Sequence, residues 1–141
     1  MIYVNSDGGA RGNPGPGAIG VVIRNEGQIL TVHSEFIGMN VTNNIAEYKA
    51  LIKALELTSK FGDEITCILD SELVIKQLLG KYKVRNQKLL KLFLEVQKLQ
   101  DNFKKIHYLH NSRWNQFQQM ADELVNRELE KRGFRKYKNE I

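Results

Sequence analysis

The opening stretch of the chain, residues 2–24, limits the possible folds more than any other part. A β-type run at residues 2–6 ends at a lone carboxylate, Asp7, and residues 8–17 then hold five glycines and both prolines before a second β-type run at 18–24. Glycine adopts backbone angles closed to other residues and lets a second backbone approach closely. The pattern therefore favours a shaped loop beside a charged site.

Known phosphate-binding loops do not explain this stretch. Its glycine spacing matches neither the phosphate loop of nucleotide hydrolases nor the dinucleotide-binding glycine motif. Asp7 is therefore a candidate metal ligand, with Arg11 and Asn13 available to contact a polymer backbone. The alternative is a wide, flexible turn with no ligand.

Hydrophobic spacing and turn residues predict the remaining elements. Strands are predicted at residues 2–6, 18–24, 28–37, 64–69 and 105–110, and helices at residues 44–60, 71–79, 87–101 and 119–132. The continuous apolar run at 64–69 is typical of an interior strand covered on both faces. The order predicts one α/β domain, a mixed sheet whose first three strands are antiparallel, with helices on its faces.

Composition narrows the class of protein. The 141 residues are 42% hydrophobic and 26% charged, which is ordinary for a globular protein, and the formal net charge of +5 mildly favours a polyanionic partner. The single cysteine, Cys67, excludes an internal disulfide and a multi-cysteine zinc site and is interpreted as a small core residue. Met1 leads directly into a strand, and no apolar run approaches about 18 residues, so we expect a cytoplasmic protein with no membrane span.

Four carboxylates are predicted where elements begin or end. Asp7 and Asp70 follow strands, whereas Glu47 and Asp122 are expected in the first turns of helices. Element ends that face one edge of a sheet are where α/β proteins place their chemistry. Each acid alone has a second interpretation as a helix-capping or solvated residue, and spacing alone does not select these four from the 16 acidic residues.

The chain resembles a known family through four ordered blocks. The blocks are Asp7-Gly8-Gly9-Ala10-Arg11-Gly12-Asn13-Pro14-Gly15, Thr42-Asn43-Asn44-Ile45-Ala46-Glu47-Tyr48-Lys49-Ala50-Leu51, Asp70-Ser71-Glu72-Leu73-Val74 and Ala121-Asp122-Glu123-Leu124. They resemble the signature blocks of type 1 ribonuclease H, in the order and at intervals compatible with that family. The resemblance covers nearly the whole chain, and it implies one domain at residues 1–132 followed by a short basic tail at 133–141.

The resemblance implies a fold and an activity. The expected fold is ribonuclease H-like, a five-stranded mixed sheet with helices on both sides. The expected reaction is endonucleolytic cleavage of the RNA strand of an RNA/DNA hybrid with Mg²⁺ or Mn²⁺, leaving 5′-phosphate and 3′-hydroxyl ends. The resemblance assigns Asp7, Glu47, Asp70 and Asp122 as the catalytic, metal-binding carboxylates.

The chemistry of these side chains agrees with that assignment. Four converging acids repel one another and raise one another's pKa values unless a cation neutralises them. Carboxylate oxygens suit Mg²⁺, which keeps several waters and takes further ligands from substrate phosphate. Two such ions about 4 Å apart would activate the attacking water and stabilise the leaving 3′ oxygen.

The resemblance also suggests which residues bind the substrate. Gly8, Gly9, Arg11 and Asn13, together with Asn43 and Asn44, are expected along the minor groove of the hybrid, where they would detect the 2′-hydroxyl groups. Thr42 is expected to hold a phosphate of the DNA strand. For Asn43 and Asn44 the alternative is helix capping alone.

The sequence departs from the family pattern before the last acid. Many members carry a histidine in that loop, whereas residues 111–120 contain none. His110 and Arg113 are therefore possible auxiliary residues, and for His110 the alternative is a strand-end histidine with no catalytic role.

A second departure lies between two predicted helices. Some members insert a basic handle there, but this chain has only residues 80–86. Lys81, Lys83, Arg85 and Lys88 form either a smaller basic patch or a solvated connector, and the basic tail is either a phosphate surface or a segment without function. Without the handle we expect weaker, strongly salt-dependent hybrid binding.

Two other functions stay open at this point. The fold is also compatible with a nucleic-acid-binding module that catalyses weakly, although all four acids are present, and with a nuclease domain detached from a reverse transcriptase. No obligate protein partner is inferred, and a monomer is expected.

Overall fold

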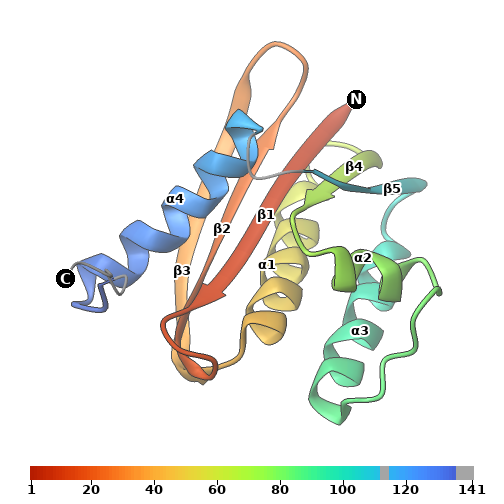
Figure 1. Cartoon of the computed structure of the whole chain (residues 1–141). Coiled ribbons are helices and arrows are strands. Elements are labelled where there is room, and N and C mark those ends of the chain that lie inside the picture. Colours follow the sequence, from red (N-terminus) through yellow and green to blue (C-terminus); the bar gives the residue numbers. More distant parts are fainter. Residues whose placement is uncertain (112–114, 136–141) are drawn as a thin grey trace.

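The computed structural model describes residues 1–111 and 115–135 (Figure 1). Their elements are β1 (Ile2–Ala10), β2 (Gly15–Arg24), β3 (Ile29–Val41), α1 (Asn43–Thr58), β4 (Glu64–Leu69), α2 (Glu72–Leu78), α3 (Gln87–Gln100), β5 (Lys105–His110) and α4 (Gln116–Lys131). The predicted order of strands and helices is confirmed. No helix in this described part is long and apolar enough to cross a membrane.

The five strands form one mixed sheet in the order β3-β2-β1-β4-β5. β1 pairs antiparallel with β2, and β2 pairs antiparallel with β3, whereas β1–β4 and β4–β5 are parallel pairs. Figure 1 shows α4 on one face of the sheet and α1 on the other. The central strand β1 therefore lies between the two helices, and the predicted fold class is confirmed.

The strands at the start of the chain are longer than predicted. β1 does not end before Asp7 but continues to Ala10, because Asp7, Gly8 and Gly9 pair with β2 residues in regular register. The glycines that suggested a loop instead serve as strand residues against which helices pack closely. Asp7 thus lies inside a strand, and the loop is confined to residues 11–14.

The helix starts also differ from prediction. Thr42 caps α1, so Glu47 lies beyond the first turn. Asn115 caps α4, because its side chain accepts hydrogen bonds from the backbone N–H groups of Phe117 and Gln118, and α4 begins at Gln116. Asp122 therefore lies in the second turn of α4, and its predicted place in the first turn is wrong.

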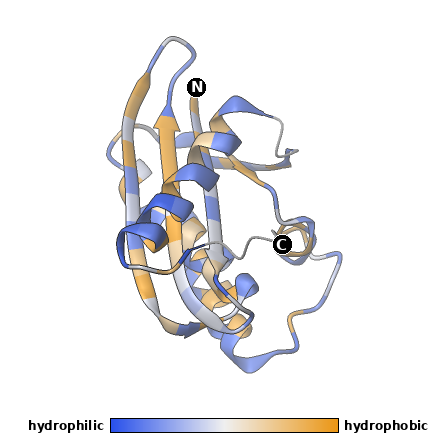
Figure 2. Cartoon of the chain, turned by 60° about the vertical axis from the view of Figure 1, so that its left-hand side comes forward, coloured by the Kyte–Doolittle hydropathy of each residue, from blue (hydrophilic) through white to orange (hydrophobic). Residues whose placement is uncertain are grey.

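The main core lies between α1 and the parallel half of the sheet. β4 is buried from Ile65 to Leu69, as its continuous apolar run predicted, and Tyr48 and Leu51 of α1 pack in the same cluster. Cys67 is fully buried, and burial raises its thiol pKa to about 12, which confirms it as an unreactive core residue. Figure 2 shows hydrophobic residues along the central strands and hydrophilic residues on the outer surface of α4.

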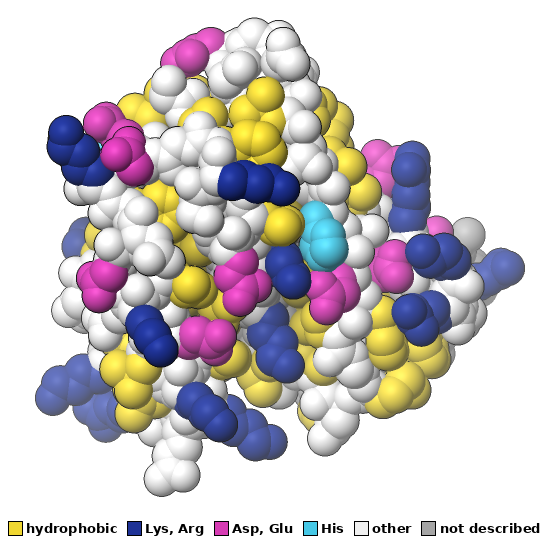
Figure 3. Space-filling view, turned by 180° about the vertical axis from the view of Figure 1, so that it is seen from behind, with side chains coloured by type: hydrophobic (Ala, Val, Ile, Leu, Met, Phe, Trp, Pro, Cys, Tyr) yellow, Lys and Arg dark blue, Asp and Glu magenta, His cyan; other side chains and the backbone are white. Residues whose placement is uncertain are grey.

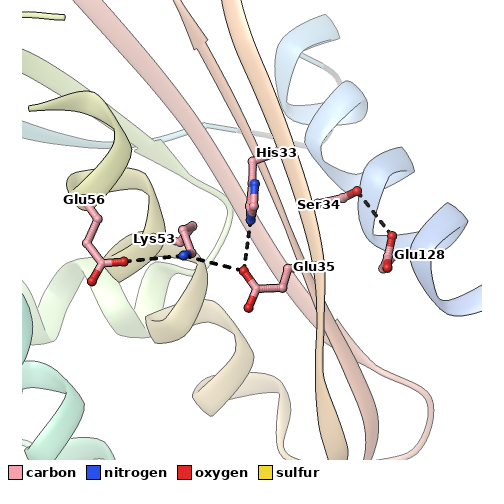
Figure 4. Close-up of polar contacts among 6 residues, drawn as sticks. All are labelled: His33, Ser34, Glu35, Lys53, Glu56 and Glu128. Atoms are coloured by element: carbon pink, nitrogen blue, oxygen red, sulfur yellow. Dashed lines mark hydrogen bonds and ion pairs between the residues drawn. The ribbon is translucent and has the colours of Figure 1, made fainter. Parts of the chain in front are cut away.

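Alternate residues of β3 contact opposite helices, as the two-residue period of a strand requires. His33 and Glu35 face α1, where Lys53 bridges Glu35 and Glu56 at 3.7 Å each, whereas Ser34 faces α4 and donates to Glu128 at 3.4 Å (Figure 4). On the face seen in Figure 3, the basic side chains are interspersed with acidic ones.

Candidate active site

Asp7 faces α4 from the middle of β1. The neighbouring odd-numbered residues of the strand point the same way, since Asn5 contacts Gln118 of α4 and a Cβ on Gly9 would lie 3.5 Å from Val125. Asp7 pairs with Gly20 of β2, where a Cβ would lie only 2.3 Å from the carbonyl oxygen of Ala121. Because Gly20 has no side chain, α4 packs closely on the sheet at Ala121, the residue that precedes Asp122.

Glu47 reaches the site from the opposite helix. A Cβ on Gly8 would lie 2.2 Å from the carbonyl carbon and oxygen of Ala46, so α1 packs directly on the bare backbone of β1. The backbone N–H of Gly8 donates a short hydrogen bond to Glu47 Oε1. Gly8 therefore both admits the helix and fixes one oxygen of this carboxylate, which is 8% exposed.

Asp70 and Asp122 complete the set. Ser6 pairs with Leu69 in the parallel ladder, so the next residues, Asp7 and Asp70, lie on neighbouring strands at the same level. Asp70 follows β4 and is exposed, and Asp122 is exposed on α4. The four acids singled out in the sequence thus lie on β1, α1 and α4 and directly after β4.

The carboxylates interact with one another. Burial raises the pKa of Asp7 well above its ordinary value, and the negative charges of Glu47 and Asp122 raise it further. Burial also raises the pKa of Glu47 to about 7, with Asp70 and Asp122 adding to the rise and the Gly8 N–H opposing it. Without a cation, protonation of Asp7 and Glu47 therefore relieves the repulsion between the acids.

These pKa values predict how stability depends on pH when no metal is present. Glu47 keeps its proton to about pH 7 in the folded chain but releases it near its ordinary value of 4.5 when unfolded. Because the folded state binds more protons in this window, the free energy of unfolding falls as pH rises from about 4.5 to about 7. The raised pKa of Asp7 acts in the same direction.

Urea unfolding in EDTA at several pH values measures this effect. We expect the Glu47→Gln variant to lose part of the pH dependence, because the glutamine keeps an acceptor for the Gly8 N–H but does not titrate. A wild-type free energy of unfolding that rises through the window, or an identical slope in the variant, would contradict the expectation.

The donor set fits a hard divalent cation. All four side chains offer carboxylate oxygens, the ligands that Mg²⁺ and Mn²⁺ prefer, and a cation would relieve the repulsion that raises the pKa values of Asp7 and Glu47. Within residues 1–111 and 115–135, no three acidic, histidine or cysteine side chains are already arranged to hold an ion.

Comparison with known proteins identifies the family. A family model described as "Reverse transcriptase-like" matches residues 5–128. Ribonuclease HI of Halobacterium salinarum is 37% identical over 131 residues, which cover 92% of this chain and 64% of that protein. The chain belongs to the type 1 ribonuclease H family.

Two further comparisons agree with this ribonuclease H assignment. Bifunctional protein Rv2228c of Mycobacterium tuberculosis is 39% identical over 110 residues, which cover 76% of this chain but only 30% of that protein. The chain thus spans less than a third of the length of this relative. The structure of LC11-RNase H1 in complex with RNA/DNA hybrid superposes with a TM-score of 0.86 at 40% identity and covers 94% of this chain and 99% of that chain.

The chain has a compact ribonuclease H fold without a basic handle. α2 ends at Leu78 and α3 begins at Gln87, and residues 79–86 join them with no further helix between. This connector carries three exposed basic residues, Lys81, Lys83 and Arg85. Their interpretation as a phosphate-binding patch stays a prediction.

A hydrogen bond connects two of the residues expected to bind the substrate, Asn13 and Asn43. Asn43 Oδ1 accepts from the Ala10 N–H at 3.1 Å, and Asn13 Oδ1 accepts from the Asn43 N–H at 2.9 Å. Thr42, not Asn43 or Asn44, caps α1, since its hydroxyl accepts from the Ile45 N–H at 3.2 Å. Capping alone therefore does not explain Asn43, which ties the start of α1 to the end of β1.

A polar groove lies beside these residues. Its volume is about 580 Å³, and its lining includes Asn13, Thr42, Asn44, Asn86, Gln87 and Lys88. Asn86 caps α3 by accepting from the Leu89 N–H at 3.1 Å. Sequence reasoning placed Lys88 in a basic patch but missed Asn86 and Gln87, because only the tertiary fold brings the start of α3 to the β1–β2 loop.

The structure places His110 and Arg11 but does not describe Arg113. His110 ends β5, and its Nε2 lies 3.1 Å from the backbone carbonyl oxygen of Asp70, so the imidazole contacts the backbone of one of the four acids. Arg113 lies outside the described residues. Arg11, expected to contact the substrate, directs its guanidinium to Asn126 of α4 at 3.0 Å.

Proposed function

We propose that the chain is an endonuclease that hydrolyses the RNA strand of RNA/DNA hybrids. The observation that carries the proposal is the grouping of four acids from separate parts of the chain: the charges of Glu47 and Asp122 raise the pKa of Asp7, and the charges of Asp70 and Asp122 raise the pKa of Glu47. Membership of the ribonuclease H family supports the reaction, and the hybrid-bound LC11-RNase H1 supports the substrate.

The four carboxylates would hold Mg²⁺ or Mn²⁺, two ions in the substrate complex. When bound, the ions supply a water of lowered pKa and positive charge for the leaving 3′ oxygen, so the products would carry 5′-phosphate and 3′-hydroxyl ends. Asp70 and Asp122 are exposed and accessible to a substrate, whereas Glu47 is buried and oriented by the Gly8 N–H. The protein contributes fixed ligands, and no side chain forms a covalent bond with the substrate.

The groove between the start of α1 and the start of α3 suits a nucleic acid backbone. Lys88 supplies a positive charge, and Thr42, Asn86 and Gln87 supply donors, so we assign the groove to a phosphate of the DNA strand. Gly8 and Gly9 leave the backbone of β1 without side chains, and Asn13, Asn43 and Asn44 offer amides to the 2′-hydroxyl groups of the RNA strand. The proposal further takes residues 1–132 as one domain that acts as a cytoplasmic monomer.

Differential labelling of the two strands tests the substrate and the product ends. With a hybrid whose RNA and DNA carry different labels, we expect fragments of RNA only. The downstream fragment should accept a kinase label only after phosphatase treatment, and the upstream fragment should prime a polymerase. Cleavage of the DNA strand, or 2′,3′-cyclic phosphate ends, would contradict the proposal.

The same assay separates the enzyme from a binding module of this fold. A module would retain the hybrid on a filter but release no fragments with either metal. Double-stranded RNA of the same sequence serves as the control for substrate choice, because it offers 2′-hydroxyl groups on both strands.

A further inference from the structure

A chain of hydrogen bonds connects Arg11 to one of the carboxylates. Arg11 follows β1, and its Nη2 donates to Asn126 Oδ1 at 3.0 Å. Asn126 lies one turn after Asp122 on α4, and its Nδ2 donates to Asp122 Oδ2 at 3.4 Å. The amide of Asn126 thus stands between a guanidinium and a carboxylate.

Contacts of both its backbone and its side chain hold Arg11 against the rest of the protein. Its backbone N–H donates to the carbonyl of Pro16 at 2.8 Å, which fixes the loop, and its Nε is buried with no partner among the described residues. A guanidinium held against α4 in this way has less freedom to follow a substrate phosphate. Its one hydrogen bond to another side chain in the described part of the chain is that to Asn126.

A second polar link lies on the other side of Asp122. Gln118 donates to the carbonyl of Ser6 at 3.0 Å and accepts from Asn5 Nδ2 at 3.1 Å, and both Gln118 and Asn5 are buried. Gln118, Asp122 and Asn126 are spaced by four residues and therefore share one stripe of the helix. Asp122 thus lies between two polar links from α4. Gln118 connects the helix to β1, and Asn126 connects it to Arg11, the residue after β1.

The hydrogen bond from Asn126 matters because Asp122 is exposed. Asp122 is exposed on α4, so the surrounding protein atoms do not by themselves fix the direction of its carboxylate. A donor that holds Oδ2 leaves Oδ1 pointing away as a ligand, and the neighbouring guanidinium strengthens the donor by polarising the amide. Outer partners of this kind orient metal ligands in many proteins.

We propose that Arg11 and Asn126 are positioning residues that hold the Asp122 carboxylate in the orientation required to bind a divalent cation. The inference rests on the proposed metal site and deepens it. It also gives Arg11 a role other than direct contact with the hybrid.

Metal titration without nucleic acid tests the proposal. Binding of Mg²⁺ is followed by backbone amide chemical shifts in the wild type, in Arg11→Ala, in Asn126→Ala and in the double variant. We expect each single variant to bind Mg²⁺ about tenfold more weakly, the lower end of the effect of outer partners. The double variant should be no weaker than the weaker single variant, because both changes break one chain of contacts.

The matched control is Arg127→Ala. Arg127 follows Asn126 in the sequence and carries the same charge as Arg11. It pairs with Glu123 at 3.2 Å, but both side chains are exposed and neither belongs to the hydrogen-bond chain that leads to Asp122. We expect unchanged Mg²⁺ affinity in this variant. Thermal unfolding in EDTA verifies that all variants are folded, and Arg11→Met, which keeps an apolar stem but has neither the charge nor a donor, replaces Arg11→Ala if the latter unfolds.

Three outcomes would overturn the inference. These are additive losses in the double variant, unchanged Mg²⁺ affinity in Arg11→Ala, and a wild type that binds no divalent cation. If Arg11 instead contacts a phosphate, Arg11→Ala should weaken hybrid binding in EDTA and reduce its salt slope by about one. Because the titration contains no nucleic acid, a chain that binds Mg²⁺ as expected but cleaves no hybrid would refute the proposed function and leave this inference intact.

Discussion

Replacing Asp7 by asparagine is expected to abolish cleavage of the hybrid and to stabilise the folded chain at pH 7 without metal. Asp7 is the central acid, since the charges of Glu47 and Asp122 act on it and it lies level with Asp70, which follows the neighbouring strand. Loss of a metal ligand removes several kcal/mol of transition-state stabilisation, or about 10³-fold or more in rate. The change in side-chain volume is minimal, so the fold is retained.

The expected gain in stability has a separate cause. Burial and the charges of two neighbouring acids raise the pKa of Asp7, which means that its ionised form is unfavourable in the folded state. An asparagine carries no charge and donates hydrogen bonds to the remaining carboxylates. The gain should decrease as pH falls toward the ordinary pKa of an aspartate, because the wild-type group is then protonated in both states.

Hybrid cleavage and urea unfolding in EDTA measure the two effects. The control is Asp63→Asn, which removes an exposed acid in the turn before β4 and should change neither activity nor stability. An Asp7→Asn variant that cleaves at more than about a hundredth of the wild-type rate, or that is less stable than wild type at pH 7, would contradict this assignment.

Substituting Gly8 by alanine is expected to produce the largest loss of stability of any single methyl group added to β1. The new Cβ would lie 2.2 Å from the carbonyl carbon and oxygen of Ala46 and 2.7 Å from the backbone nitrogen of Glu47. Backbone atoms cannot rotate away as a side chain does, so α1 must move. We expect a loss of about 3 kcal/mol or more in the free energy of unfolding, at or beyond the upper end of overpacking effects.

Activity should fall together with stability. Moving α1 away from β1 breaks the hydrogen bond from the Gly8 N–H to Glu47, which orients that carboxylate. The adjacent Gly9→Ala is the matched control for stability, because its Cβ would meet only Val125 Cγ1 at 3.5 Å, an ordinary contact. Urea unfolding of both variants decides the matter, and equal stabilities would show that α1 does not rest on the bare backbone at Gly8.

The sequence predicted elements well where local patterns agree with the tertiary fold. The apolar run from Glu64 to Leu69 is a buried strand with the predicted bounds, and β5 also has its predicted bounds. The pattern failed at the glycines after Asp7, because glycine has weak strand preference by itself and becomes a strand residue here through pairing with β2 and close packing of α1 and α4. The start of α4 was missed for a related reason, since Asn115 is one of several polar residues there able to cap a helix.

The four acids were predicted through the family resemblance, because spacing alone did not distinguish them from other capping or solvated acids. The contacts that hold them were not predicted. The Gly8–Glu47 hydrogen bond joins residues 39 apart in sequence, and the Arg11–Asn126 hydrogen bond joins residues 115 apart. Such contacts follow from how α1 and α4 pack on β1, and no local pattern encodes them.

Cleavage of an end-labelled RNA/DNA hybrid with Mg²⁺, Mn²⁺ or EDTA is the most direct test of the central claim, that the four acids form a metal-dependent nuclease site. Single-stranded RNA, double-stranded RNA and DNA serve as substrate controls, and Asp70→Asn serves as the inactive variant. The account predicts that only the RNA of the hybrid is cut, with metal, and not by Asp70→Asn. A hybrid that is bound but left intact with both metals would contradict it and identify the fold as a binding module.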